Sequence, residues 1–295
     1  MHTTLSVDGR TRSLTVVGDP DGPVGRALVL VFHGSKQDGS THRRSTGGAL
    51  DRLADAGRAV VVYLDGHRGN WNDARAASAF PARTEGIDDV AFARAVVDAV
   101  AASHRIDRAR VVGVGYSNGG QMVFRLLHEQ SQVLAGAVVV AAAMPDRDGF
   151  LGDFSTTTEH AVPVTLAAGT ADRIVPFGGG RMAWWARRLF RVDGTTLSAD
   201  ATARYFAQRN GIDTAPVVSD VPAPTDGRRG PRTEQSTWSA PGRPPVVLYT
   251  VHGGGHTVPG PVAAPAVLGR TGSARGVDEM TEQVLDALDG GHPAA

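Results

Sequence analysis

The segment Gly115-Tyr116-Ser117-Asn118-Gly119 holds a serine with glycines two positions away on either side. It follows the apolar run 111–114, and the residues after it, 121–130, can form a helix. A serine between a buried strand and a helix must turn sharply, and the glycines let neighbouring backbone pass close to it. Such a turn presents the serine hydroxyl at the top of a sheet, where a nucleophile has to lie. The pattern alone is weak, so its interpretation depends on residues elsewhere in the chain.

A serine hydroxyl is a poor nucleophile unless a base lies within hydrogen-bond reach and an acid orients that base. In serine enzymes with a strand-turn-helix nucleophile, the chain order is Ser, then Asp or Glu, then His. Asp172 follows the predicted strand 162–168, and His256 follows the predicted strand 245–251 after three glycines. We therefore predict a catalytic triad of Ser117, Asp172 and His256.

Other residues compete for the base and the acid. His252 lies at the end of the same strand as the preferred base, but the three glycines before His256 let its loop turn back over the sheet. The same glycines argue against a helix that would place both histidines on one face, so we predict no metal site. Asp172 has the alternative of a turn-forming residue. Weaker candidates for the acid follow the preceding strand, namely Asp146, Asp148 and Asp153.

Acyl transfer also needs fixed donors for the negative charge that develops on the carbonyl oxygen. The residue after the nucleophile, Asn118, offers one backbone N–H, and we expect the second from Ser35 in the loop His33-Gly34-Ser35. His33 is a candidate for shaping that loop or for contacting substrate. Tryptophans are more often packing residues, but three of them on loops near strand ends are candidate walls of an acyl pocket: Trp71, Trp184 and Trp185.

The predicted elements bring these residues to one edge of a sheet. Continuous apolar runs, typical of strands buried on both faces, cover 27–32, 59–64, 110–114, 135–143, 162–168 and 245–251. Helices are predicted at 86–103 and 277–288, a short one near 46–56, and an antiparallel hairpin at 3–7 and 12–17. This order predicts an α/β fold with a mostly parallel central sheet, helices on both faces and an N-terminal hairpin. Ligands of such sheets bind at the carboxyl ends of the strands, which is where His33, Ser117, Asp172 and His256 are expected.

Composition narrows the classes of partner. The 295 residues suit a single α/β domain, 1–295, with insertions near 177–198 and 214–244, the second able to form a surface hairpin. Thirty acidic residues balance 30 basic ones, so no nucleic-acid or anionic-membrane partner is expected. Cysteine is absent, which excludes thiolate chemistry. No apolar run is long enough to span a membrane, and residues 1–8 lack the features of a signal peptide, so a cytoplasmic location is expected from the residues. The oligomeric state has no signal in the sequence.

Five segments together resemble the polyhydroxybutyrate depolymerase and feruloyl esterase family of α/β-hydrolases, in the family's order. They are Val31-Phe32-His33-Gly34-Ser35, Asp88-Asp89-Val90-Ala91-Phe92, Gly115-Tyr116-Ser117-Asn118-Gly119-Gly120, Gly169-Thr170-Ala171-Asp172-Arg173-Ile174-Val175-Pro176 and Gly253-Gly254-Gly255-His256-Thr257-Val258-Pro259-Gly260. The resemblance implies the same triad, no cofactor, and an exported enzyme. It implies as substrates small or polymeric hydroxyalkanoate esters, or hydroxycinnamoyl esters of plant polysaccharide.

We therefore expect a serine carboxylic-ester hydrolase that works through an acyl-enzyme. Two alternatives stay open from the sequence. Another serine acyl-transfer enzyme, a peptidase or an acyltransferase, would use the same triad. A binding protein without catalytic activity can also be built on this scaffold, because fold does not determine function.

Overall fold

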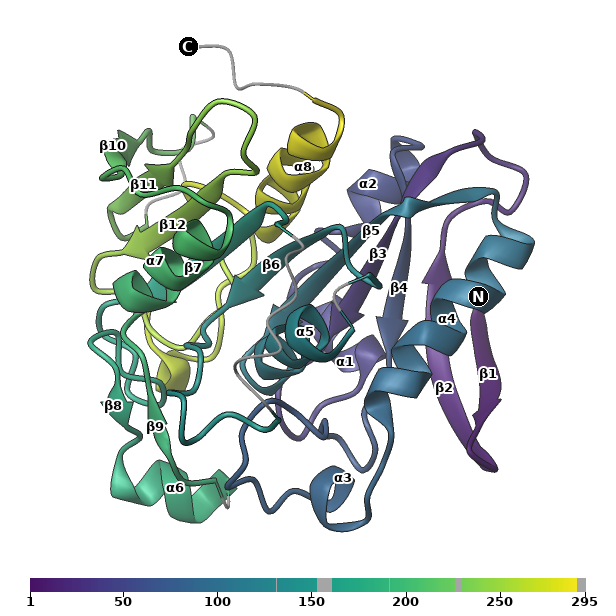
Figure 1. Cartoon of the computed structure of the whole chain (residues 1–295), viewed down its shortest axis with the longest axis horizontal. Helices are drawn as coiled ribbons and strands as arrows, with labels where there is room; N and C mark the ends of the chain where they lie inside the picture. The colour runs from purple at the N-terminus through teal and green to yellow at the C-terminus, as the bar shows by residue number, and fades with distance from the viewer. Residues whose placement is uncertain (131, 153–160, 191, 226–229, 291–295) are drawn as a thin grey trace.

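The computed structural model describes residues 1–130, 132–152, 161–190, 192–225 and 230–290. Its centre is a 10-stranded sheet in the order β1-β2-β4-β3-β5-β6-β7-β12-β11-β10 (Figure 1). Strands from β4 to β12 in this order run parallel, and antiparallel pairs complete both edges. The predicted α/β-hydrolase architecture, with a mostly parallel sheet and an N-terminal hairpin, is confirmed.

The parallel strands are the continuous apolar runs of the sequence. They are β4 (Ala59–Leu64), β3 (Arg26–Phe32), β5 (Ile106–Tyr116), β6 (Gly136–Val140), β7 (Val164–Gly169) and β12 (Val246–Val251). Every residue of β3, β4, β6 and β12 is buried, because helices cover both faces of the sheet. The edge strands are β1 (His2–Val7), β2 (Arg10–Val17), β10 (Val217–Val221) and β11 (Thr233–Trp238).

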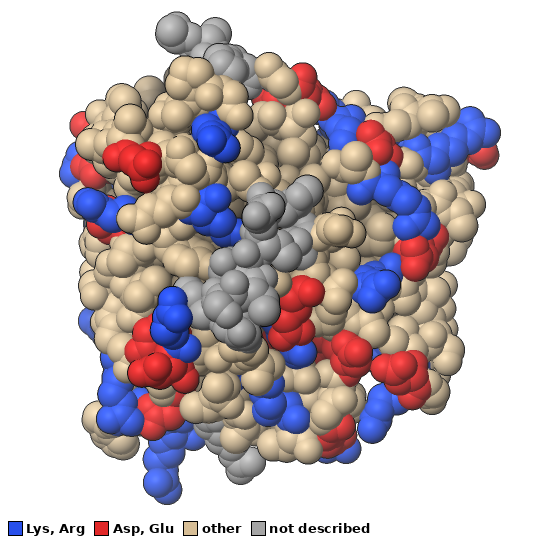
Figure 2. Space-filling model, in the orientation of Figure 1, with Lys and Arg blue, Asp and Glu red and all other residues tan. Residues whose placement is uncertain are grey.

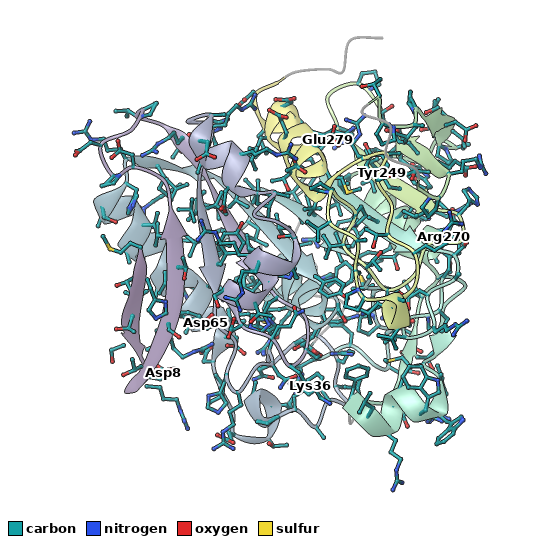
Figure 3. All side chains as sticks on the ribbon, turned by 180° about the vertical axis from the view of Figure 1, so that it is seen from behind. Asp8, Lys36, Asp65, Tyr249, Arg270 and Glu279 are labelled. Atoms are coloured by element: carbon teal, nitrogen blue, oxygen red, sulfur yellow. The ribbon has the colours of Figure 1, made fainter. Side chains whose placement is uncertain are left out.

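Two layers of helices enclose the sheet. On the near face in Figure 1 lie α4 (Asp89–Ser103), α5 (Asn118–Glu129) and α7 (Ala199–Arg209), which contribute Phe92, Phe124 and Phe206 to one hydrophobic cluster. On the far face lie α1 (Gly39–Ser45), α2 (Asp51–Asp55) and α8 (Val277–Leu288). Seen from that side, Tyr249 of β12 lies beneath α8, and its hydroxyl donates to the side-chain oxygen of Gln283 at 2.8 Å (Figure 3).

The structure departs from the predicted elements in several places. Of the helix expected near 46–56 only α2 forms, because Gly47 and Gly48 adopt positive φ angles before it, and α1 lies ahead of the predicted range. Helix α7 was not predicted, although Ser198 caps it and Ala199, Ala203 and Phe206 are buried at helical spacing. The two strands of insertion 214–244 pair antiparallel as predicted, and through β12 they also extend the main sheet.

The carboxyl ends of the parallel strands meet at the lower edge of the sheet in Figure 1. The small elements of the loops gather at the same edge: α3 (Pro81–Thr84), α6 (Trp184–Phe190) and the paired strands β8 (Gly180–Arg181) and β9 (Thr195–Thr196). Insertion 177–198 contains three of these elements, and the short helix η2 (Ala266–Leu268) follows β12. This edge therefore brings together the loops that carry the predicted site residues.

The outer surface carries charges of both signs. On the face shown in Figure 2, basic and acidic side chains alternate over short distances, as the balanced composition predicts. Among the helices of the described residues, none combines the length and the apolar character required to cross a bilayer.

Candidate active site

Ser117 occupies the sharp turn between β5 and α5, in a strained conformation with φ 53° and ψ −114°. A non-glycine residue adopts such angles only when the surrounding structure imposes them. A Cβ atom on Gly119 would collide with the carbonyl oxygen of Phe32, and one on Gly115 with the carbonyl oxygen of Gly119. The two glycines of the motif are therefore required because backbone passes directly against them.

Three side chains from three strand ends form a continuous chain of hydrogen bonds. The Ser117 hydroxyl lies 2.9 Å from Nε2 of His256, and Nδ1 of His256 lies 2.7 Å from Oδ2 of Asp172. The other carboxylate oxygen of Asp172 accepts from the backbone N–H groups of Ile174 and Val175 at 2.7 and 2.9 Å. The carboxylate can only accept, so Nδ1 carries the proton and Nε2 is free to take the proton of the serine hydroxyl.

The base and the acid of this chain are both shielded from water. The side chains of His256 and Asp172 are 5% and 2% exposed. The hydroxyl of Tyr116 donates to the backbone carbonyl of His256 at 2.8 Å and holds the loop of the base against the strand that carries the nucleophile. A Cβ atom on Gly34 would lie 2.7 Å from the Tyr116 ring, so the neighbouring loop also needs a glycine there.

The competing candidates lie elsewhere. His252 is on the surface, where its Nε2 lies 2.8 Å from a guanidinium nitrogen of Arg232. Asp146 accepts from the backbone N–H of Gly149 at 2.8 Å, and Asp148 is exposed to solvent. Asp153 falls outside the described residues. Of these alternatives, none that the structure describes lies in the hydrogen-bonded chain with Ser117.

Two backbone donors are available beside the nucleophile. Asn118 is the first residue of α5, so its N–H has no partner within the helix. Among the described residues, no hydrogen bond uses the backbone N–H of Asn118 or that of Ser35. Ser35 and Ser117 line the same cavity. These two groups are therefore free to donate to an oxygen in that cavity.

His33 and Trp71 do not line that cavity, so Trp71 is not the predicted wall of an acyl pocket, and His33 has the alternative role of shaping its loop. Both side chains are fully buried because they tie loops together. The Nδ1–H of His33 donates to the carbonyl of Gly34 at 2.7 Å, and Nε2 accepts from the backbone N–H of Gly66 at 2.9 Å. Burial lowers the pKa of His33, which fits this neutral imidazole. The indole N–H of Trp71 donates to the carbonyl of His33 at 2.9 Å.

The other two tryptophans lie on α6. Trp184 is 71% exposed and borders an open hollow of about 500 Å³, and Trp185 is 40% exposed. Neither lines the cavity at Ser117. The aromatic residue of α6 that does so is Phe190, and the ammonium of Lys36 lies 5.6 Å from the centre of its ring (Figure 3 shows Lys36).

The sequence did not identify a buried polar network beneath the nucleophile. The side-chain oxygen of Asn118 accepts from the backbone N–H of Trp71 at 2.9 Å, and its amide nitrogen donates to Asp73. Asp73 is fully buried and also accepts from the backbone N–H and the guanidinium of Arg75. A local signal is the spacing of Asp73 and Arg75, because an aspartate side chain can accept from the backbone N–H two residues further on.

The cavity at Ser117 is small, with a volume of about 20 Å³. A second cavity of similar size lies beside it, and both are lined by Arg75, Gln121, Val175 and Met182. Gln121 was also not identified from the sequence, although its position four residues after Ser117 on α5 places the two side chains on one helix face. The site thus combines an activated serine, two free backbone donors and a narrow cavity with polar residues.

Comparison with known proteins identifies esterases as relatives of this chain. A family model described as phospholipase/carboxylesterase matches residues 56–187. The protein named "Putative esterase NocK" from Nocardia uniformis subsp. tsuyamanensis is 34% identical over 275 residues, which is 90% of this chain and 76% of that protein. Poly(3-hydroxyalkanoate) depolymerase C from Paucimonas lemoignei is 26% identical over 255 residues, 80% of this chain and 56% of that protein.

Solved structures support the fold. Acetyl xylan esterase from Aspergillus awamori superposes with a TM-score of 0.54, at 15% identity, over 88% of this chain and 94% of that chain. This likeness concerns the fold alone, whereas the match to NocK extends over most of both sequences. The chain belongs to a family of α/β-hydrolase esterases, and it is a carboxylic ester hydrolase.

Proposed function

We propose that the chain hydrolyses esters through an acyl-enzyme on Ser117. The serine hydroxyl attacks the ester carbonyl while Nε2 of His256 takes its proton, and the intermediate then expels the alcohol, which leaves with that proton. His256 next removes a proton from water, which attacks the acyl group. The acid leaves as the proton returns to the serine. The observation that carries this proposal is the hydrogen-bonded chain from Ser117 through His256 to Asp172.

Each remaining part of the site has a role in this scheme. Asp172 keeps the proton of His256 on Nδ1 and stabilises the imidazolium that forms after proton transfer. The backbone N–H groups of Ser35 and Asn118 hold the oxyanion, and a donor of this kind contributes about 3 kcal/mol to the stability of the transition state. Both donors are fixed before substrate arrives, so the reaction needs no rearrangement to use them.

The name of one relative favours a short aliphatic acyl group. The cavity of about 20 Å³ beside Ser117 has room for one hydroxyl but for neither a whole hydroxybutyryl group nor a hydroxycinnamoyl ring, so its size does not decide between them. A relative that covers 80% of this chain is named as a poly(3-hydroxyalkanoate) depolymerase. We therefore propose short hydroxyalkanoate esters or oligomers as substrates, ahead of feruloyl esters.

Two measurements test this function. A fluorophosphonate probe should label wild-type protein, and peptide mapping should place the label on Ser117. Methyl 3-hydroxybutyrate and a hydroxybutyrate oligomer should be hydrolysed faster than methyl ferulate, and all esters faster than the matching amides. Faster amide cleavage would indicate a peptidase, and failure of the probe to react would indicate a binding protein.

A further inference from the structure

The polar side chains Arg75 and Gln121 lie beside Ser117 on the walls of both small cavities. The mechanism above uses neither of them. Gln121 comes from the first turn of α5, where its backbone N–H donates to the carbonyl of Ser117 at 3.1 Å. Side chains on a helix lean toward its N-terminus, so that of Gln121 is directed back toward the nucleophile. Arg75 comes from the loop between β4 and α3.

The amide of Gln121 has one bonded and one unbonded end. Its Nε2 donates to the backbone carbonyl of Ala143 at 2.7 Å, and a carbonyl can only accept, so Oε1 is the atom left over. That oxygen is buried, as is the residue as a whole, which is only 3% exposed. It has no hydrogen-bond partner among the described residues. A buried acceptor without a partner costs about 1 to 3 kcal/mol, so its presence beside the nucleophile requires an explanation.

Arg75, which lines the same cavity, carries a donor that is not used elsewhere. Its Nε and Nη2 are bonded to Asp73, and among the described residues no hydrogen bond uses Nη1. No hydrogen bond joins Arg75 to Gln121 either, so the donor and the acceptor are each available to a third group. The positive charge of Arg75 is balanced by the buried carboxylate of Asp73, which leaves the cavity without an excess of charge.

Two residues that line one cavity, one with an unused donor and one with an unused acceptor, fit a group that both accepts and donates. A hydroxyl does this, since its oxygen accepts from the guanidinium and its proton goes to Oε1. A carboxylate fits poorly because it only accepts, and its charge would face the lone pairs of Oε1. We propose that Arg75 and Gln121 form a subsite that binds a hydroxyl group on the acyl part of the substrate and so determines specificity for hydroxylated short acyl groups. This inference rests on the proposed function, and it assigns two residues to a role within it.

The test compares esters that differ by one hydroxyl. Hydrolysis of methyl butyrate, methyl 2-hydroxybutyrate and both enantiomers of methyl 3-hydroxybutyrate is followed by titration of the acid released. For wild-type protein we expect kcat/KM of at least one hydroxylated ester to exceed that of methyl butyrate about tenfold or more, with one enantiomer preferred. A ratio near one for every hydroxylated ester would overturn the subsite. Faster hydrolysis of the charged ester monomethyl succinate would also overturn it.

Two variants then assign the preference to these residues. Gln121→Met keeps the length of the side chain and removes the acceptor, and Arg75→Lys keeps the charge beside Asp73 and removes the guanidinium. Each variant should lower the ratio of kcat/KM for the hydroxylated ester to kcat/KM for methyl butyrate about tenfold. A general loss of active protein does not change this ratio. Gln130→Met, at the opposite end of α5, is the matched control and should leave the ratio unchanged.

The outcomes separate the two proposals. An unchanged ratio in both Gln121→Met and Arg75→Lys contradicts the subsite while hydrolysis itself stands. If wild-type protein hydrolyses none of the esters, or if Ser117→Ala still hydrolyses them, the proposed function is contradicted. The subsite then fails with it.

Discussion

The indole N–H of Trp71 donates a hydrogen bond to the backbone carbonyl of His33 at 2.9 Å. The backbone N–H of the same tryptophan donates to the side chain of Asn118, also at 2.9 Å. One buried residue thus contacts both segments that hold the proposed oxyanion donors, the loop of Ser35 and the start of α5. The distance between the two donors therefore depends on a residue that does not line the cavity.

Replacing Trp71 with Phe should lower kcat about tenfold with a smaller change in KM. Phenylalanine keeps an aromatic ring at this position, but the carbonyl of His33 loses its donor. The Ser35 loop is then held less firmly, because a hydrogen bond of this kind contributes about 1 kcal/mol. Steady-state kinetics on a short activated ester measure the effect. Trp238→Phe is the control, because Trp238 is equally buried but lies on β11. If both variants lower kcat to the same extent, Trp71 has no special role at the site.

The two histidines after β12 should differ sharply in their effect on rate. His256→Gln removes the proposed base and should lower kcat by a factor on the order of 10⁶, the loss seen when a triad histidine is removed. His252→Gln changes a surface residue and should leave kcat within about twofold of wild type. A large loss of kcat in His252→Gln together with a small loss in His256→Gln would mean that the wrong histidine has been identified as the base.

Neighbouring aspartates at the start of α4 should differ in their effect on stability. Asp89 is fully buried and pairs with Arg12 at 2.6 Å, which ties β2 to the helix. Asp89→Asn leaves that guanidinium without its counter-charge and should lower the free energy of unfolding by about 3 kcal/mol. Asp88 caps the helix by accepting from the N–H of Ala91 at 2.8 Å, and Asp88→Asn keeps a good cap, so its cost should be below about 0.5 kcal/mol. Equal costs in urea denaturation would contradict the assigned ion pair.

His42 should make the fold sensitive to mild acid. Its ring is buried and stacks on Tyr116 with centres 5.8 Å apart, and burial lowers its pKa from 6.5 to about 3. Between these values the unfolded chain binds the proton more readily than the folded chain, so stability is complete above pH 6.5 and falls as the pH decreases toward 3. The loss attributed to this residue is about 2 kcal/mol at pH 5.

His42→Phe keeps a ring on Tyr116 and removes the titrating group. The free energy of unfolding is measured in urea at pH 7 and at pH 5. Its decrease between the two pH values should be about 2 kcal/mol smaller for this variant than for wild type. Other histidines titrate in both proteins and cancel in the comparison. Identical pH dependence of the two proteins would show that His42 is not the group responsible.

Much of this molecule was predictable from local patterns. The central strands were identified because burial on both faces demands continuous apolar runs, as in β3 and β4. Ser117, Asp172 and His256 were predicted because a triad needs a fixed chain order, and parallel strands deliver their following residues to one edge. Both arguments depend only on the order of residues along the chain.

The remaining features depend on contacts between distant segments. Trp71 was expected in the wall of an acyl pocket and His33 was a candidate substrate contact, but the burial of both follows from loop packing that the sequence does not display. Arg75 reaches the cavity because Asp73, itself held by Asn118, fixes the direction of its side chain. Gln121 is different, since its spacing from Ser117 on a predicted helix was enough to place it beside the nucleophile.

Acyl-enzyme formation on Ser117 is tested by measuring kcat of Ser117→Ala on an activated short-chain ester, with folding checked by thermal denaturation. We expect a folded protein whose kcat is lower by a factor on the order of 10⁶, because the residual rate comes only from binding and the oxyanion donors. A folded Ser117→Ala variant that keeps most of the wild-type kcat would contradict acyl-enzyme formation on Ser117.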